Sequence, residues 1–195
     1  DFDVYKRERK CKAIKGEVPL TPELCRLFGY YLSEGSTWHR EIKFSFHKKE
    51  THFLADVMNL LKELGLRPQI KPKGSAGAIV RASSNHLAYF LKATFGGKVY
   101  DKAIPQQWLG LPRQHVEGLL KGIWYGDGSA AGGNYVLGLC SHRLANQVYL
   151  ILLSFGIACC FSISPAHRGA DGTWHREAYY IRIRHTREIA KLTPI

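Results

Sequence analysis

The sequence predicts an α+β fold built from two similar halves. An apolar helical run that ends in acid-Gly-Ser occurs twice, at residues 24–36 and 117–129. The same order of strand and helix patterns follows each run, so the repeat extends over most of the 195 residues. The apolar content of 45% is sufficient for a core that both halves share. We therefore expect two pseudo-symmetric αββαββα halves that pack through the repeated helices, each with a four-stranded antiparallel sheet.

The elements of the first half follow from changes in hydrophobic period. Strands repeat apolar residues at every second position and helices at every third or fourth. The pattern predicts, in order, a helix at 24–36, a strand at 42–47, a helix at 52–64 that ends at Gly65, strands at 67–73 and 78–83, and a helix at 85–95.

The second half repeats this order. Its expected elements are a helix at 117–129, a strand at 135–141, a helix at 142–155 that ends at Gly156, strands at 157–165 and 178–184, and a helix at 185–192. The chain is accordingly divided into a basic arm at 1–20, a first half at 21–95, a linker at 96–112 and a second half at 113–195. Gly and Pro residues in the linker break regular structure.

Positive charge is in excess: 28 Lys and Arg against 16 Asp and Glu give a net charge of +12. Self-repulsion on this scale opposes a compact state and indicates an anionic partner. Nucleic acid is favoured over a membrane surface, and no apolar run approaches the roughly 18 residues of a membrane span. The basic arm, from Lys6 to Lys15, fits either a solvated tail or a nucleic-acid contact. From charge alone, a structural RNA-binding protein is the alternative.

The cysteines and the first residues bear on the compartment. The five cysteines are odd in number and have no C-x-x-C spacing, so neither a disulfide framework nor a zinc site is expected. We expect reduced and mostly buried thiols. The first residues contain no apolar segment of the kind that a secretory signal needs. These features favour an intracellular location.

Glu34 and Asp127 end the two repeated runs, 127 − 34 = 93 residues apart. The carboxyl end of a helix carries partial negative charge, so an acid in the last turn costs up to about 1 kcal/mol. Gly35 and Gly128 follow the acids, and we expect each to end its helix in the left-handed conformation. An ordinary core helix with a glycine stop explains either copy alone. Two acids at matching places indicate divalent cations bound through oxygen.

Small residues lie four apart in each run, as Gly29 and Ser33 and as Gly122 and Gly126. Small residues allow two helix backbones to approach closely. We expect the repeated helices to pack side by side and parallel, which would bring the two acids together at one end.

The two runs resemble the LAGLIDADG motif of homing endonucleases. The matching copies are Leu27 to Gly35 and Leu120 to Gly128. The order of elements is similar to the αββαββα half of that family, twice over. The Lys-Ala-Ile-Pro at 102–105 is most similar to the intein-associated and archaeal branch. The first motif ends in Glu34 where the family name has Asp, although both acids occur as ligands in the family.

The resemblance implies a monomeric, metal-dependent endonuclease that cuts double-stranded DNA at a specific site and leaves 3′ overhangs. Glu34 and Asp127 are implied as ligands of Mg²⁺, with the backbone of Ser33 and Gly126 as further candidates. Mn²⁺ is expected to substitute, and Ca²⁺ is expected to bind without supporting cleavage. Lys102 is implied as the basic catalytic residue.

Other features of the family stay open for this chain. Lys98 is the fallback for the basic residue, and Lys191 is a weak candidate from the second half. An intracellular, archaeal or other prokaryotic-like host is expected, with an organelle as the alternative. The chain lacks the Cys or Ser start and the His-Asn end of a splicing domain. The alternative function is a non-cleaving binder of nucleic acid, an RNA maturase or a transcription factor, but such relatives often lack the acids.

Polar side chains alternate with apolar ones along the predicted strands. Such a polar face can contact base edges in the major groove, which admits a two-stranded ribbon, and it can also simply meet water. The target is expected to be a pseudo-palindromic duplex site of roughly 20 base pairs, since each half would cover about one helical turn. The candidate DNA contacts are Lys43, Ser45, His47, Lys48, Arg67, Gln69, Lys71, Lys73, Arg81, Ser141, Arg168, Arg182 and Arg184.

Overall fold

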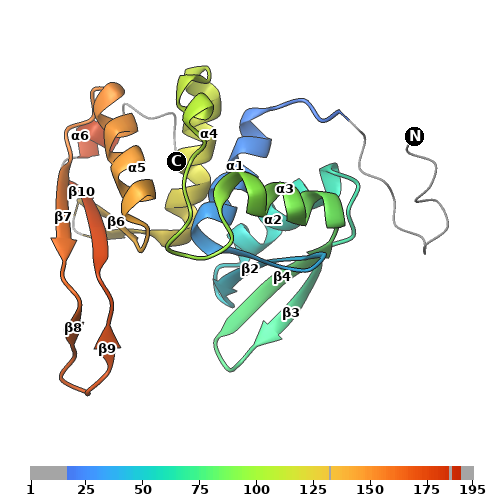
Figure 1. Cartoon of the computed structure of the whole chain (residues 1–195), viewed down its shortest axis with the longest axis horizontal. Coiled ribbons are helices and arrows are strands. Elements are labelled where there is room, and N and C mark those ends of the chain that lie inside the picture. The colour runs from blue at the N-terminus through green and yellow to red at the C-terminus, as the bar shows by residue number, and fades with distance from the viewer. Residues whose placement is uncertain (1–16, 132, 185, 190–195) are drawn as a thin grey trace.

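The computed structural model describes residues 17–131, 133–184 and 186–189, arranged as two halves on either side of a central helix pair (Figure 1). The first half contains α1 (Pro22–Glu34), β1 (Gly35–Trp38), β2 (Glu41–His47), α2 (Thr51–Glu63), β3 (Gln69–Lys73), β4 (Gly77–Ser83) and α3 (Asn85–Phe95). This order confirms the predicted αββαββα half.

The second half repeats that order with one addition. It contains α4 (Arg113–Asp127), β5 (Gly128–Ala131), β6 (Asn134–Leu139), α5 (His142–Ser154), β7 (Cys160–Ser164), β8 (His167–Arg168), β9 (Trp174–His175), β10 (Ala178–Ile183) and α6 (Thr186–Ile189). The addition is the β8–β9 pair, a narrow ribbon that extends beyond the main sheet, between the strands predicted at 157–165 and 178–184, where the sequence predicts no strand (Figure 1).

Each half forms a four-stranded antiparallel sheet, as predicted, with strand orders β1-β2-β4-β3 and β5-β6-β10-β7. The two sheets also share a register. Gly35 pairs with Phe44 in one sheet and Gly128 pairs with Leu137 in the other, and both members of the second pair are 93 residues later (128 − 35 and 137 − 44). From the ends of α1 and α4 through β2 and β6, a residue in one half therefore has its structural counterpart 93 positions away.

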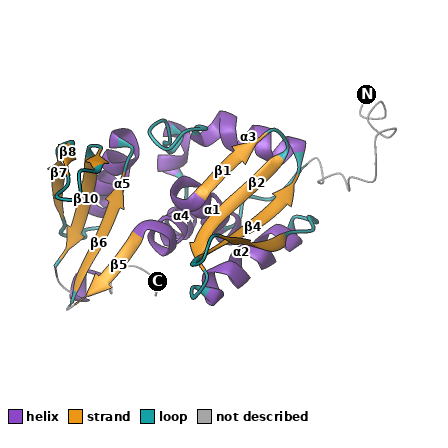
Figure 2. Ribbon diagram, turned by 90° about the horizontal axis from the view of Figure 1, so that it is seen from below, coloured by secondary structure: helices purple, strands orange, loops and turns teal. Residues whose placement is uncertain are grey.

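The two central helices, α1 and α4, lie side by side between the sheets (Figure 2). A Cβ added at Gly122 would lie 2.0 Å from the Arg26 carbonyl oxygen, and one added at Gly29 would lie 2.1 Å from the Leu119 carbonyl oxygen. Gly118 makes the same kind of approach to Pro22, one turn earlier in both helices. The contacts advance together along the two helices, which confirms the predicted close and parallel packing.

The expected left-handed glycines at the ends of these helices are wrong. Gly35 has φ −80° and Gly128 has φ −87°, so both are extended and pass directly into β1 and β5. Glycine is required there by space. A Cβ would lie 2.5 Å from the Tyr31 Cα at Gly35 and 2.4 Å from the Trp124 carbonyl oxygen at Gly128.

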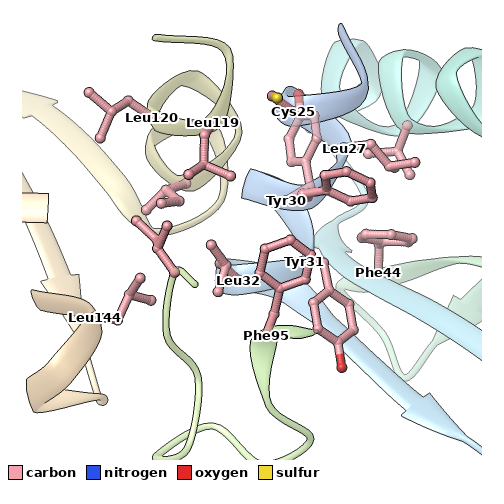
Figure 3. Close-up of a cluster of buried hydrophobic side chains, with 14 of the residues drawn as sticks. Cys25, Leu27, Tyr30, Tyr31, Leu32, Phe44, Phe95, Leu119, Leu120 and Leu144 are labelled. Atoms are coloured by element: carbon pink, nitrogen blue, oxygen red, sulfur yellow. The ribbon is translucent and has the colours of Figure 1, made fainter. Parts of the chain in front are cut away.

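The hydrophobic core runs through the helix pair from one half to the other. Leu119, Leu120 and Leu144 lie on the second-half side of the cluster, and Tyr30, Phe44 and Phe95 lie on the first-half side (Figure 3). The linker adds a 3₁₀ helix, Gln106–Gly110, whose Trp108 packs on Phe28 and Phe95 at ring-centroid distances of 5.4 and 5.2 Å. The linker is therefore part of the core rather than a loose connection.

Two further expectations concern composition. No helix in the described part of the chain is both long and apolar enough to cross a bilayer. The four described cysteines are free thiols, of which Cys25 is buried while Cys140 and Cys160 are exposed. Buried thiols are thus fewer than expected.

Candidate active site

The two acids lie at one end of the central helix pair. Glu34 is the last residue of α1 and Asp127 is the last residue of α4. A Cβ added at Gly126 would lie 2.9 Å from the Glu34 Cγ, so the second helix ends directly beside this side chain. Both acids are partly buried. The parallel packing thus brings together two carboxylates that are 93 residues apart in the chain (127 − 34).

Both carboxyl groups are held in a setting that favours the protonated form. Burial, followed by the charges of Asp127 and Glu50, raises the pKa of Glu34 to about 7, against the opposing effects of Lys102 and Lys73. Burial raises the pKa of Asp127 to about 6, against the effect of Lys102. Desolvated acids beside one another are stabilised by a cation that both can bind.

Lys102 is buried beside the acids. Its Nζ donates hydrogen bonds to the carbonyl oxygens of Tyr31, at 2.5 Å, and Gly35, at 2.6 Å. Tyr31 lies in the last turn of α1, where the helix dipole is negative, and its carbonyl oxygen also accepts from the Gly35 N–H, while Gly35 is the first residue of β1. Burial lowers the pKa of Lys102 to about 8, while Asp127 and Glu34 oppose that change. The cation that the helix end favours is therefore supplied from the linker.

The segment that carries Lys102 is fixed to the second half. The Ser141 Oγ donates to the Lys102 carbonyl oxygen at 2.6 Å, and the Gln147 side chain bonds both the N–H and the carbonyl of Ile104. Ile104 is fully buried, and the Ala103 N–H donates to the Phe95 carbonyl oxygen. Lys102 thus joins the end of α1 to the start of α5.

Ser141 is a correction to the predicted DNA contacts. It is buried, and its Oγ also accepts from the Leu144 N–H as the N-cap of α5. A buried hydroxyl that already donates one hydrogen bond and accepts another is not available to contact DNA. The local signal was available, because Ser directly before a helical pattern is a typical N-cap. Gln147 was missed, since an amide within a helix gives no sign of its distant partner.

The residues at the ends of the second strands also differ from expectation. Two of the predicted DNA contacts, Lys48 and Ser141, lie beyond these strands, because β2 ends at His47, whose counterpart is Cys140 (47 + 93). Lys48 is exposed and its Nζ donates to the Ser75 carbonyl oxygen. Desolvation and the charge of Asp127 raise the pKa of Cys140, although the residue as a whole is exposed. Cys140 is therefore near Asp127 and Lys102.

The donor set at the helix ends suits a hard cation. Glu34 and Asp127 offer carboxylate oxygens, and Ser33 and Gly126 lie in the last turns, where carbonyl oxygens lack intrahelical donors. No group of three or more His, Cys, Asp or Glu side chains gathers among the described residues. A cation bound here would therefore take two carboxylates, with backbone oxygen, water or a phosphate completing its coordination.

One face of the first sheet carries most of the other predicted contacts. Lys43, Ser45 and His47 alternate with buried Ile42, Phe44 and Phe46, and Arg81 lies opposite Lys43. Gln69, Lys71 and Lys73 are exposed on the adjacent edge strand, β3. Arg67 is exposed but precedes β3, so it lies outside the strand.

The predicted contacts of the second half are more dispersed. Arg182 lies on β10, donates to the Ser162 Oγ and covers the Tyr180 ring. Arg168 lies on the β8–β9 ribbon, and Arg184 is exposed just after β10. Lys98 is exposed in the linker, whereas Lys102 is buried beside the acids. Lys191 and the basic arm from Lys6 to Lys15 lie outside the described residues.

Comparison with known sequences gives a consistent family. Residues 114–193 match the family described as LAGLIDADG-like domain. An uncharacterised protein of Methanocaldococcus jannaschii is 31% identical over 163 residues, which cover 80% of this chain and 20% of that protein. The DNA polymerase II large subunit of Thermococcus kodakarensis is 36% identical over 132 residues, 65% of this chain and 7% of the subunit. The chain thus spans about a fifth or less of these relatives.

Comparison with solved structures gives the same fold. A structure of variants of the homing endonuclease I-DmoI has a TM-score of 0.63 at 15% identity and covers 88% of this chain and 93% of that one. I-DmoI in complex with DNA and Ca has the same score and identity, with coverage of 88% and 87%. Full-length DUF199/WhiA from Thermatoga maritima has a TM-score of 0.61 at 14% identity, with coverage of 91% of this chain and 56% of that one.

Proposed function

This chain belongs to the LAGLIDADG family, and from that premise we propose that it is a site-specific endonuclease that hydrolyses double-stranded DNA with a divalent metal. The observation that carries the proposal is the meeting of Glu34 and Asp127 at one end of the helix pair, between two sheets. Burial raises the pKa of both acids, and the charge of Asp127 adds to the rise for Glu34, in spite of the opposing effect of Lys102 on both. A non-catalytic helix pair would have no use for this arrangement.

In this proposal Glu34 and Asp127 hold Mg²⁺, with the backbone of Ser33 and Gly126 as further candidate ligands. Mn²⁺ is expected to replace Mg²⁺, and Ca²⁺ to bind without supporting cleavage. The bound metal would supply an activated water and stabilise charge on the phosphate in the transition state. The scissile phosphate would lie next to the two acids, because a cation bound by Glu34 or Asp127 can also bind the oxygens of the phosphate.

Lys102 contributes positive charge and position. With a pKa of about 8 it is mostly protonated at pH 7, and its Nζ is engaged with two carbonyl oxygens. A protonated, buried ammonium is suited to electrostatic stabilisation rather than to accepting a proton from water. It also fixes the end of α1, from which Glu34 projects.

The partner would be a duplex of roughly 20 base pairs, with each half over about one helical turn. The net charge of +12 supports a polyanionic partner. The structures of I-DmoI with DNA and either Ca or Mn are consistent with such a partner and with divalent metals. We further propose that the chain acts as a monomer with halves at 21–95 and 113–195, and that it leaves 3′ overhangs. Intron or intein mobility, an intracellular location and a prokaryotic-like host stay predictions.

A second candidate is a binder that does not cut. The LAGLIDADG fold also occurs in proteins that do not cut, and the likeness to WhiA supports this candidate. The WhiA structure covers 91% of this chain, against 88% for the endonuclease. The two retained acids favour the endonuclease, since a binder gains nothing from desolvated carboxylates that repel phosphate.

A cleavage screen separates the two candidates. We expect the chain to cut members of a randomised duplex library in Mg²⁺ and to bind the same members in Ca²⁺. Asp127→Asn should keep the binding and lose cleavage by roughly 100-fold or more, as for removal of one charge-stabilising group. The control is Glu63→Gln, which removes an exposed charge on α2. Binding without cutting by the unaltered chain supports the binder, and undiminished cutting by Asp127→Asn contradicts the mechanism.

A further inference from the structure

A carboxylate interrupts the basic face of the first sheet. Glu41 is the only acid in strands β1 to β4, all of whose residues are described. It begins β2 and lies opposite Ser83 on β4 and Trp38 on β1. Since side chains alternate between the two faces of a strand, Glu41 shares a face with Lys43 and with Arg81, which lies opposite Lys43.

Glu41 is paired with both of these cations. Its Oε2 lies 3.1 Å from the Lys43 Nζ, and its Oε1 accepts from an Arg81 guanidinium nitrogen. The acid lies deeper than its partners, because its side chain is 21% exposed while those of Lys43 and Arg81 are 33% and 46% exposed. The outer layer of this cluster is therefore positive, with the negative charge beneath it.

This layering suggests what the acid contributes. A carboxylate on a surface that meets DNA weakens attraction to phosphate, which is the sequence-independent part of binding. An arginine on an exposed strand is otherwise free to rotate about its long side chain. A fixed arginine loses less freedom on binding and can present its remaining donors in a defined direction. The arrangement thus fixes the orientation of the arginine donors at the expense of the net positive charge of the sheet.

Arg81 is well placed for reading a base. It lies in a row across three adjacent strands, between Lys43 on β2 and Gln69 on β3. Arginine bonds the O6 and N7 atoms of guanine through two parallel N–H groups, and a small sheet can enter the major groove where these atoms lie. One N–H of Arg81 is occupied by Glu41, and others remain on an exposed guanidinium.

We propose that Glu41 is a specificity-determining positioning residue, which holds Arg81 so that its guanidinium reads one guanine in the major groove of the target. The inference rests on the proposed binding of duplex DNA. It does not depend on cleavage, because the Glu41 cluster lies on the sheet and not at the helix ends.

The test uses selection of duplexes from a randomised library in Ca²⁺, with the full chain and four variants: three single substitutions and the double variant that combines Glu41→Gln with Arg81→Lys. Glu41→Gln keeps the size of the side chain and removes its charge. Arg81→Lys keeps the charge and removes the two-pronged donor. Glu63→Gln is the matched control, because it removes the same charge from an exposed site on α2.

We expect the unaltered chain to select a guanine at one position that Arg81→Lys no longer selects. Glu41→Gln should reduce the preference for that same guanine by roughly 5- to 100-fold, the range for loss of one good arginine–guanine pair. It should also bind unselected duplex more tightly and with a steeper salt dependence, since a negative charge is removed. The double variant should lose no more than Arg81→Lys alone, and Glu63→Gln should keep the preference.

Identical base preferences for Glu41→Gln and the unaltered chain would overturn the inference while leaving the proposed function intact. A loss of preference that is spread evenly over all positions would also overturn it, since that result indicates a general structural role. Failure of the unaltered chain to select any duplex would overturn the proposed function, and this inference with it.

Discussion

The two halves share one architecture and differ in the surfaces that they present. Both halves have the same sheet order, and the acid at the helix end and the register of the first two strands recur at an interval of 93 residues (128 − 35). The exposed face of the first sheet carries Lys43, Lys71, Lys73 and Arg81. At the positions equivalent to Lys43 and His47, the second half has Val136 on β6 and Cys140 directly after β6 (43 + 93 and 47 + 93).

The second half has fewer basic residues on its sheet but carries an additional ribbon. Its β8–β9 ribbon, which has no counterpart in the first half, carries Arg168 and two stacked histidines, His167 and His175. Close packing of α1 and α4 therefore keeps the centre of the molecule symmetric. The exposed faces of the two sheets do not take part in this packing, and their residues differ. A target read by such a surface would be only approximately palindromic.

The largest effect is expected at the helix pair, where symmetry is strictest. Gly122→Ala places a Cβ 2.0 Å from the Arg26 carbonyl oxygen, so the helices must separate. We expect a loss of about 3 kcal/mol in the free energy of unfolding, as for severe overpacking. Because the core is continuous, both halves should unfold in one transition, measured by urea denaturation followed by circular dichroism. Gly110→Ala, with open space around its Cβ, should change little. Separate transitions for the two halves would contradict a shared core.

The next effect concerns Lys102, which supports the end of α1. Lys102→Met removes the two hydrogen bonds to Tyr31 and Gly35 along with the buried charge. We expect Mg²⁺-dependent cleavage to fall roughly 100-fold, as when one charge-stabilising group is lost. Exposed Lys98 provides the control, Lys98→Met, for which cleavage should stay near that of the unaltered chain. An equal loss in both variants would indicate general attraction to DNA instead.

A smaller effect concerns pH and the two acids. The pKa of Asp127 is raised from 3.8 to about 6, so the folded state favours the protonated form. This contribution to stability is present below pH 3.8 and is lost as pH rises through about 6. Without metal, Asp127→Asn should therefore be more stable than the unaltered chain at pH 7, by about 1–2 kcal/mol after allowance for solvent screening.

Thermal melts of both proteins at pH 4 and pH 7 measure this difference, which should shrink or reverse at pH 4. Mg²⁺ should stabilise the unaltered chain more than the variant, since ligand binding to the folded state adds stability. A variant that is less stable than the unaltered chain at pH 7 in the absence of metal would contradict the raised pKa.

The smallest effect compares the two sheets. Replacing both Lys71 and Lys73 with Gln should reduce the steepness of the plot of log binding constant against log salt concentration by roughly 2, or about 1 per phosphate contact. Neutralising Arg182 to Gln on the second sheet should lower it by at most about 1. Fluorescence anisotropy with a labelled duplex at several salt concentrations measures both slopes. Equal slopes for the two variants would remove the proposed difference between the sheets.

Several features could be read from sequence because their signals are local. The helix and strand periods gave the order of elements, and residues 85–95 were assigned as a helix with the bounds that α3 has. Errors arose where the deciding contact is distant. Position 35 requires glycine because Tyr31 leaves no room for a Cβ, and Ser141 is buried because it bonds the linker. The β8–β9 ribbon looked like a loop because each of its strands has only two residues.

By itself the sequence determined that an acid ends each of two repeated helices and that basic residues alternate along the strands, since both depend only on spacing along the chain. The small residues of the two runs also predicted that the acids would meet. Tertiary structure alone decided that the Lys102 Nζ bonds the carbonyl oxygens of Tyr31 and Gly35 and that Glu41 lies beneath Arg81. These facts depend on how closely separate backbones approach, and that distance is set by packing across the core rather than by any local period.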